Sequence, residues 1–314
     1  MVVFYFCPDA PLRSAGIRLL YRHVEILVRH GINASILHVD SGFQMPDVPS
    51  VPVHYLNVPN TVAQGDVVVV PEGYPGVMAL LKGRPLRRFV IALSWDYVYT
   101  LMPSDCDWRS LGIERVLSNS PFIGEFISWS TRLPSTVFRW GIKPSLYFPQ
   151  NNKQLEVVFI ARKQERIEAL QKILLARDPR YLSHVKWTAL HDMSEAEYAA
   201  AIRRAFIFIN LSSAEGLPCA ILEAMRCNTL VAGYNSVGGQ RELVGSGFKQ
   251  NAILVDTLDY PTLATKLDPV LADMLNGDVR RYQPILQNAL TTSAAYDWDS
   301  EESSIVGMWR EFLA

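Results

Sequence analysis

A strand–loop–helix–strand pattern between residues 206 and 232 constrains the fold more than any other part of this sequence. Phe206–Leu211 and Thr229–Ala232 are apolar runs typical of buried strands, and Ala220–Met225 consists of good helix formers. Asn228, between the helix and the second strand, tolerates the left-handed backbone that follows a helix end. The segment therefore predicts one unit of a parallel α/β sheet.

Two glutamates occupy the loop and the helix of this unit. Glu215 precedes the helix, and Glu223 lies inside it, eight positions later, which is a little over two helical turns for the part that is helical. The two carboxylates can therefore point into one cleft with an extended ligand between them. On spacing alone, two solvated surface glutamates explain the pattern as well. The flanking glycines and the wider sequence context favour a ligand site.

The residues around this pair resemble the signature of the retaining, metal-independent glycosyltransferases of the GT-B fold, family 4. The signature is carried by Glu215-Gly-Leu-Pro, Leu222-Glu-Ala-Met and Val237-Gly-Gly-Gln-Arg-Glu-Leu-Val. Two further landmarks occur in the family's order, Trp140-Gly-Ile-Lys-Pro-Ser-Leu-Tyr-Phe-Pro and the terminal segment from Tyr296-Asp-Trp-Asp to Trp309-Arg-Glu-Phe-Leu. The resemblance is dense from about Val137 to the end of the chain and thin before it.

The resemblance implies an α/β fold of two Rossmann-like domains that face each other across a cleft, with a C-terminal helix that crosses back to the first domain. We expect residues 1–150 to form the acceptor-side domain, 151–295 the nucleotide-sugar-binding domain, and 296–314 the crossing helix. The length agrees, because 314 residues are many for one core and natural for two units of about 150 residues.

Composition excludes several other classes of protein. The chain carries 30 basic and 31 acidic side chains, so its charge gives no reason to expect nucleic acid as a partner. Its four cysteines lack zinc-site spacing, and no apolar segment approaches the roughly 18 residues of a membrane helix. We expect a cytoplasmic protein whose membrane contact, if it has one, is peripheral. The basic run Lys82, Arg84, Arg87 and Arg88 is a place for such contact, although a solvated turn before a strand is the simpler interpretation.

The resemblance also implies roles for the residues of the second half. Glu215 would bind hydroxyls of the donor sugar and stabilise positive charge near the anomeric carbon, and Glu223 would accept hydrogen bonds from the two ribose hydroxyls. The backbone at the start of the helix would meet phosphate or sugar oxygens. That stretch comprises Gly216, Leu217, Pro218 and Cys219.

Cations for the donor diphosphate are expected after the strand that opens the second domain. Arg162 matches the family's arginine, but Ile167 stands where the family has a lysine. The second cation would therefore be Lys163 or Arg166.

The first half retains fewer of the family's residues. Gly16 alone remains of the double glycine that approaches the diphosphate, and it also suits a simple helix start. Asp96 matches an aspartate that faces the donor sugar in the family, but Trp95 replaces the histidine that usually precedes it. A loop-capping role for Asp96 is the alternative.

The expected activity is transfer of a hexose or deoxyhexose from a nucleotide diphosphate to a hydroxyl acceptor, without a metal ion or other cofactor. The triplets Asp105-Cys-Asp107 and Asp297-Trp-Asp299 resemble the metal motif of the other glycosyltransferase fold. The first lacks a preceding strand, and the second suits a helix cap. A catalytically silent relative that binds a sugar nucleotide or a partner, and a GT-B sugar-nucleotide epimerase, are the alternatives. The nucleobase, sugar, acceptor, linkage and oligomeric state stay open.

Overall fold

The chain folds into two compact units, as a computed structural model that describes residues 1–11, 14–161 and 167–314 shows. The first domain consists of Met1–Trp140 together with Asp299–Ala314, and the second domain is Gly141–Trp298. The chain passes from the first domain to the second between residues 140 and 141, whereas the expected boundary followed residue 150. Its position follows from the first sheet, whose last strand ends at Val137.

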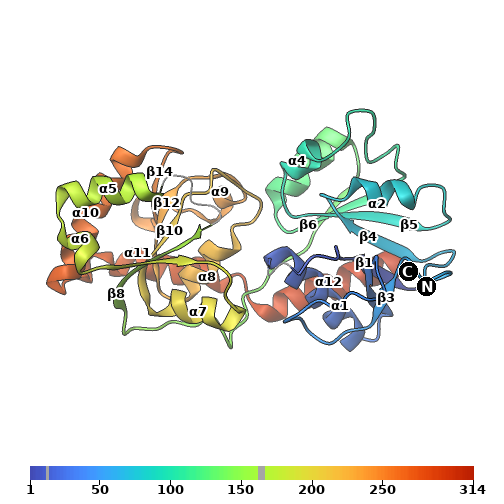
Figure 1. Ribbon diagram of the computed structural model, residues 1–314, viewed down its shortest axis with the longest axis horizontal. Helices are drawn as coiled ribbons and strands as arrows, with labels where there is room; N and C mark the ends of the chain where they lie inside the picture. Colours follow the sequence, from blue (N-terminus) through green and yellow to red (C-terminus); the bar gives the residue numbers. More distant parts are fainter. Residues whose placement is uncertain (12–13, 162–166) are drawn as a thin grey trace. The chain divides into compact units, whose positions relative to one another are not determined.

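The first domain contains one parallel sheet with strand order β3-β2-β1-β4-β5-β6-β7. The strands are β1 (Val3–Phe6), β2 (Ala34–His38), β3 (Val53–Tyr55), β4 (Val67–Pro71), β5 (Arg87–Ala92), β6 (Arg115–Ser118) and β7 (Ser135–Val137). The helices are α1 (Ala15–Arg29), α2 (Pro75–Leu80), α3 (Tyr97–Thr100), α4 (Pro121–Thr131) and α12 (Trp298–Leu313). Helices α1 and α12 lie on one side of the sheet, and α2 and α4 lie on the other (Figure 1).

Helices on both sides explain the strand sequences. Strands β1 and β2 are buried along their whole length, as continuous apolar runs in parallel sheets usually are. Helix α1 begins where the Ser14 hydroxyl accepts the Ile17 N–H at 3.2 Å. The chain turns after this helix at Gly31, whose φ of 75° suits glycine.

Helix α12 belongs to the first domain although it ends the chain. Trp309 is fully buried, donates its indole N–H to the Tyr5 hydroxyl at 2.8 Å, and stacks on Phe89 with 5.7 Å between ring centroids. Glu301, which is also fully buried, forms an ion pair with Arg22 of α1. These contacts make α12 part of the first domain's core.

The second domain contains a five-stranded parallel sheet with strand order β14-β12-β10-β8-β9, and a separate pair formed by β11 and β13. The strands are β8 (Gln154–Ile160), β9 (Lys186–Leu190), β10 (Ala205–Asn210), β11 (Ala214–Glu215), β12 (Leu230–Tyr234), β13 (Val237–Gly238) and β14 (Ile253–Val255). The α-helices are α5 (Ile167–Arg177), α6 (Arg180–Ser183), α7 (Glu195–Arg204), α8 (Cys219–Arg226), α9 (Gln240–Leu243), α10 (Tyr260–Asn276) and α11 (Gln283–Ala294), and short 3₁₀ turns η2 (Gly247–Lys249) and η3 (Arg280–Tyr282) complete the domain.

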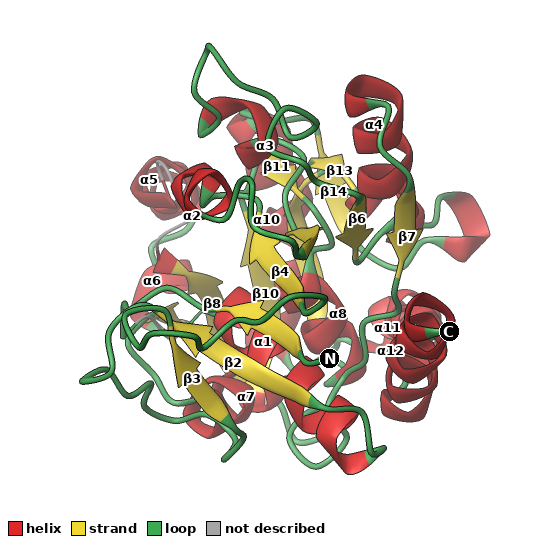
Figure 2. Ribbon diagram, turned by 90° about the vertical axis from the view of Figure 1, so that its right-hand side faces the viewer, coloured by secondary structure: helices red, strands yellow, loops and turns green. Residues whose placement is uncertain are grey.

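Helix packing in this domain follows from its local sequence signals. Helix α5 packs on α10, and α8 lies beside α11 (Figures 1 and 2). Ser194 and Glu197 form a capping box that starts α7, as the sequence predicts. The expected strand–loop–helix–strand unit is β10, the loop with β11, α8 and β12, and Asn228 has the predicted left-handed backbone with φ 58°.

Gly233 allows two strands of this sheet to approach each other, and Gly233→Ala tests its role. Its φ is 141°, and a Cβ at this position would lie 1.8 Å from the carbonyl oxygen of Asn210. We expect Gly233→Ala to lower the free energy of unfolding by about 2 kcal/mol or more, because β10 and β12 must shift or strain. Urea denaturation measures the change. Gly307→Ala, on α12 with open space around the new methyl group, is the control and should be neutral or stabilising.

Candidate functional site

The loop after β10 carries Glu215 on a short strand. Glu215 pairs with Gly238 of β13 in a parallel register, and the Gly239 N–H donates to the Gly216 carbonyl at 2.7 Å. Gly238 has φ 126°, a conformation that favours glycine. Two glycine-containing segments, far apart in sequence, therefore meet at Glu215, whose side chain is partly exposed.

A buried polar network stabilises these two segments. The Ser236 hydroxyl oxygen lies 2.7 Å from the Ser212 carbonyl oxygen and 2.6 Å from Gln240 Oε1. The Gln240 amide donates to the Tyr234 carbonyl at 2.7 Å. Ser236 and Gln240 are fully buried, so the network fixes the loop that ends at Gly238.

Helix α8 follows directly and carries Glu223. Pro218 occupies the N-cap of α8, one position before the first helical turn. Glu223 is only 6% exposed, in contrast to Glu215. A buried carboxylate is expensive unless it has a specific task or partner. Glu215, Gly216, Leu217, Pro218, Cys219 and Glu223 thus form one contiguous region of the second domain.

Tyr296 is a neighbour of this region that the site prediction left out. Burial, with Glu242 and Cys219 nearby, raises the pKa of its phenol to about 12. The Tyr296 carbonyl accepts the Ile142 N–H at 2.9 Å, so the segments that enter and leave the second domain meet here. The sequence showed Tyr296 only as part of a family landmark.

The expected diphosphate cations Arg162, Lys163 and Arg166 lie outside the described residues. Ile167, at the position where the family has a lysine, begins α5 and is 7% exposed in the domain's hydrophobic core. The residue at this position therefore packs inward, as its apolar side chain requires.

In the first domain, Gly16, at the start of α1, lies close to the segment that leads from β5 to Asp96. A Cβ on Gly16 would lie 3.4 Å from Leu93, one residue before the Ser94-Trp-Asp-Tyr segment. Asp96 stands at the start of α3, but its side chain makes no capping hydrogen bond and is partly exposed. The alternative of a capping aspartate is therefore not how this carboxylate is used. Both loops lie at the carboxyl ends of parallel strands, where α/β proteins bind ligands.

Glu72 is a second acidic residue at this edge, and no sequence motif points to it. It follows β4 directly, is 5% exposed, and accepts the N–H groups of Leu93 at 3.0 Å and Ser94 at 2.8 Å through one carboxylate oxygen. Burial raises the pKa of Glu72 to about 7 against the lowering effect of these hydrogen bonds. Glu72 thus ties the end of β4 to the loop that carries Asp96.

Glu72→Gln should change how stability depends on pH. The folded-state pKa lies above the ordinary value of 4.5, so the carboxyl's contribution is complete below pH 4.5 and is lost as pH rises through 7. Glutamine keeps an acceptor oxygen and stays neutral. We expect the variant to match the wild type near pH 4.5 and to be more stable at pH 8, by about 2–3 kcal/mol at most. Melting temperatures at both pH values measure this, and an equal difference at both would contradict it.

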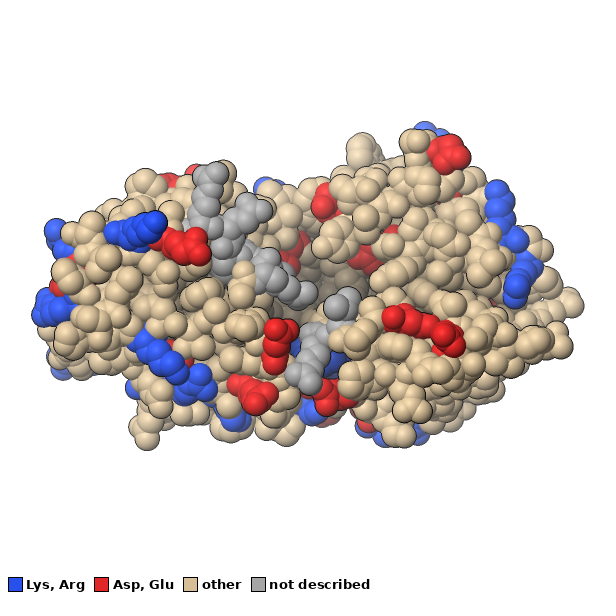
Figure 3. Space-filling view, in the orientation of Figure 1, with Lys and Arg blue, Asp and Glu red and all other residues tan. Residues whose placement is uncertain are grey.

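Two residues of the basic run, Arg87 and Arg88, form hydrogen bonds within the first domain. Arg87 and Arg88 belong to β5, which corrects the expectation of a turn that ends before the strand. Arg87 donates to the Phe312 carbonyl at 2.6 Å, and Arg88 donates to carbonyls of Arg84, Leu86 and Leu111. Over the face shown in Figure 3, basic and acidic side chains are scattered among neutral ones.

The described residues also bear on metal binding and on membrane crossing. In residues 1–11, 14–161 and 167–314, no group of three or more His, Cys, Asp or Glu side chains is placed to hold a metal ion. Among the helices of the same residues, none combines the length and apolar character that crossing a bilayer requires.

Comparison with solved structures places the chain in a fold family. A sucrose-phosphate synthase from Thermosynechococcus elongatus aligns over 99% of both chains with a TM-score of 0.72 and 13% identity. Anabaena Alr3699/HepE, solved in complex with UDP and glucose, aligns over 100% of this chain and 99% of its own with a TM-score of 0.70 and 14% identity. A Rickettsia africae glycosyltransferase aligns over 99% and 98%, with a TM-score of 0.68 and 14% identity.

Sequence comparison adds the family. No curated protein matches the sequence significantly. The model of the glycosyl transferases group 1 matches residues 150–283, a range that includes Glu215 and Glu223. Two parallel-sheet domains, the matched range and the structural relatives agree with the resemblance drawn from the sequence. The chain therefore has the GT-B fold of these structures, and its residues 150–283 match the model of the glycosyl transferases group 1.

Proposed function

We propose that this protein is a glycosyltransferase that moves a sugar from a nucleotide diphosphate to a hydroxyl acceptor, with retention of anomeric configuration and without a metal ion. The observation that carries the proposal is the placement of partly exposed Glu215 just before α8 and of buried Glu223 within it, inside the matched family segment. The Anabaena relative solved with UDP and glucose supports a uridine nucleotide as the first donor to test.

In this proposal the two carboxylates have different tasks. Glu223, held in the buried part of α8, accepts hydrogen bonds from the two ribose hydroxyls, for which a carboxylate has two acceptor oxygens. Glu215 contacts the sugar and stabilises the positive charge that develops as the bond to the diphosphate breaks. The cations Arg162, Lys163 and Arg166 would balance the charge of the leaving diphosphate. Gly16 and Asp96 would contribute from the first domain.

A catalytically silent relative is the second candidate, and one observation favours it. Ile167, at the position of the family's lysine, is packed in the core, so this position supplies no cation to a diphosphate. Such a protein would bind the sugar nucleotide and not turn it over.

Donor binding and turnover test both candidates. UDP-glucose, UDP-N-acetylglucosamine and GDP-mannose are each added to the purified chain, and the melting temperature and nucleotide release are followed with and without EDTA. We expect one donor to raise the melting temperature in proportion to its affinity and to be hydrolysed slowly, equally with EDTA present. Stabilisation without hydrolysis would support the silent relative, and no response to any donor would refute both. NMR of the released or transferred sugar tests retention, because an inverted anomeric centre contradicts it.

A further inference from the structure

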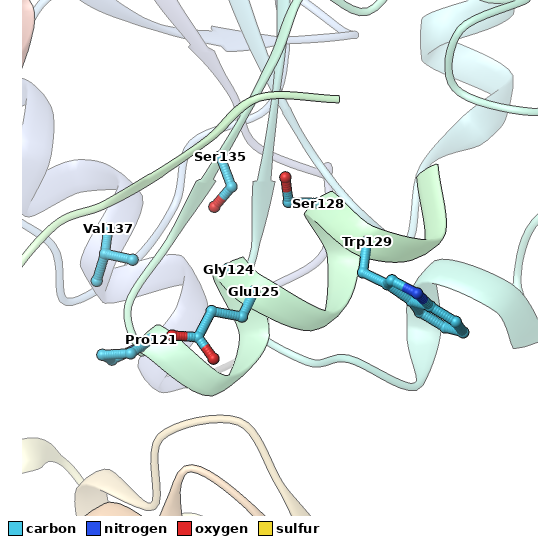
Figure 4. Close-up of a pocket in the computed structure, with 7 residues that line it drawn as sticks. All are labelled: Pro121, Gly124, Glu125, Ser128, Trp129, Ser135 and Val137. Carbon is cyan, nitrogen blue, oxygen red and sulfur yellow. The ribbon is translucent and has the colours of Figure 1, made fainter. Parts of the chain in front are cut away.

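A groove on the first domain offers a second place for carbohydrate. It lies between α4 and the edge strand β7 and has a volume of about 450 Å³, within the roughly 300–1,000 Å³ typical of small-molecule sites. Figure 4 shows Pro121 and Glu125 near the start of α4, Ser128 and Trp129 further along the helix, and Ser135 and Val137 on the neighbouring strand. The lining comprises Pro121, Gly124, Glu125, Ser128, Trp129, Ser135 and Val137.

Gly124 sets how closely the helix approaches the strand. A Cβ at this position would lie 2.7 Å from Ser135 Oγ and 3.0 Å from Ser118 Oγ, so a larger residue would push α4 away from β7. The Ser135 hydroxyl at this contact is buried and has no hydrogen-bond partner among the described residues. Buried polar groups are nearly always hydrogen-bonded, so an internal water would complete this contact.

The lining chemistry identifies the class of ligand. Trp129 is 77% exposed, which is unusual for an indole and leaves its flat apolar face open to a partner. Glu125 and Ser128 are hydrogen-bonding groups for hydroxyls, and the lining contains no Lys or Arg. An aromatic face beside hydroxyl-binding groups fits a sugar ring, which has an apolar face and a rim of hydroxyls. The absence of a cation from the lining disfavours phosphate groups and anionic lipid headgroups.

A row of aromatic side chains connects the groove to the loop of Asp96. Phe126 lies 6.1 Å from Trp129, 5.8 Å from Tyr99 and 6.0 Å from Trp95, measured between ring centroids. Tyr97 and Tyr99 of α3 are 53% and 45% exposed. Trp95 immediately precedes Asp96, so the aromatic row begins at the proposed site and ends at Trp129.

We infer that the groove between α4 and β7 binds a sugar unit of an extended acceptor, remote from the reacting hydroxyl, and that the acceptor is therefore an oligosaccharide or a longer glycan. The inference rests on the proposed function, because it assigns the acceptor of that reaction. Trp129 stacks on the sugar ring, and Glu125 accepts hydrogen bonds from its hydroxyls.

Binding to defined saccharides tests the inference without requiring turnover. The full chain is applied to a broad glycan array and titrated with maltopentaose, cellopentaose and chitopentaose and with the corresponding monosaccharides. We expect at least one oligosaccharide to bind at least tenfold more tightly than its monosaccharide, and Trp129→Ala to weaken that binding about tenfold. Glu125→Gln should weaken it less. Phe248→Ala, which removes a 90% exposed aromatic residue from the second domain, is the matched control and should bind like the wild type.

The outcomes separate this inference from the proposed function. The inference would be overturned if the protein bound none of the oligosaccharides, or if Trp129→Ala bound them as tightly as the wild type. Adsorption to phosphatidylcholine vesicles that depends on Trp129, without glycan binding, would instead identify a membrane contact. Donor hydrolysis in the absence of acceptor should be unchanged in Trp129→Ala. If the wild type does not hydrolyse any donor, the proposed function is refuted whatever the result of the glycan binding.

Discussion

Glu215→Gln is expected to reduce the turnover of the sugar nucleotide by about 10²–10³-fold while leaving donor affinity nearly unchanged. The amide keeps the size of the side chain but loses the negative charge that the proposal places beside the developing positive charge. Glu215 is partly exposed on the short strand β11, so the substitution leaves the fold intact. Steady-state rates of nucleotide release, with donor affinity from calorimetry, separate the two quantities.

Glu223→Gln provides the contrast. An amide offers one acceptor oxygen instead of two, so binding of the ribose hydroxyls should weaken and KM should rise about tenfold with a smaller change in kcat. Asp278→Asn removes an exposed carboxylate that pairs with Arg280 and lies on none of the proposed site's loops, so it should change neither quantity. Equal losses of kcat in Glu215→Gln and Asp278→Asn would refute a specific role for Glu215.

Trp309→Ala is expected to destabilise the first domain by about 3–5 kcal/mol. The substitution removes a fully buried indole that stacks on Phe89 and donates a hydrogen bond to Tyr5. Urea denaturation measures the loss. Trp309→Phe keeps an aromatic ring and should lose much less. Trp129→Ala, which removes an exposed indole from the same domain, should leave stability within about 0.5 kcal/mol of the wild type.

Hydrogen exchange locates the effect of Trp309→Ala. Amides of the first domain, including those of β1 and β5, should exchange faster, and those of residues 141–298 should keep their rates. Equal acceleration in both domains would contradict the assignment of α12 to the first domain's core.

Much of the fold could be predicted because the local signals agree with each other. The run Val3–Phe6, the cap at Ser194 and the left-handed Asn228 each reflect residues whose own preferences match the final structure. The α/β class and the two parallel sheets were therefore confirmed. The pair formed by β11 and β13 was not foreseen, because two-residue strands carry no periodic pattern.

Features that depend on distant neighbours were also missed. Nothing near Glu72 in the sequence shows that Leu93 and Ser94 bring N–H groups to its carboxylate. Arg87 was interpreted as part of a solvated turn because the carbonyl it contacts belongs to Phe312, at the other end of the chain. The residues of the proposed site were identified through the family resemblance, and their roles remain predictions that the experiments above address.

The position of α12 in the chain also affects the order in which the two domains can finish folding. During translation, residues 141–298 leave the ribosome as one continuous stretch that contains the strands of the five-stranded sheet. The first 140 residues emerge earlier, but Glu301 and Trp309, which complete their core, follow the whole second domain in the chain. The first domain is thus expected to finish folding only after the second domain has been synthesised, although its first 140 residues are made earlier.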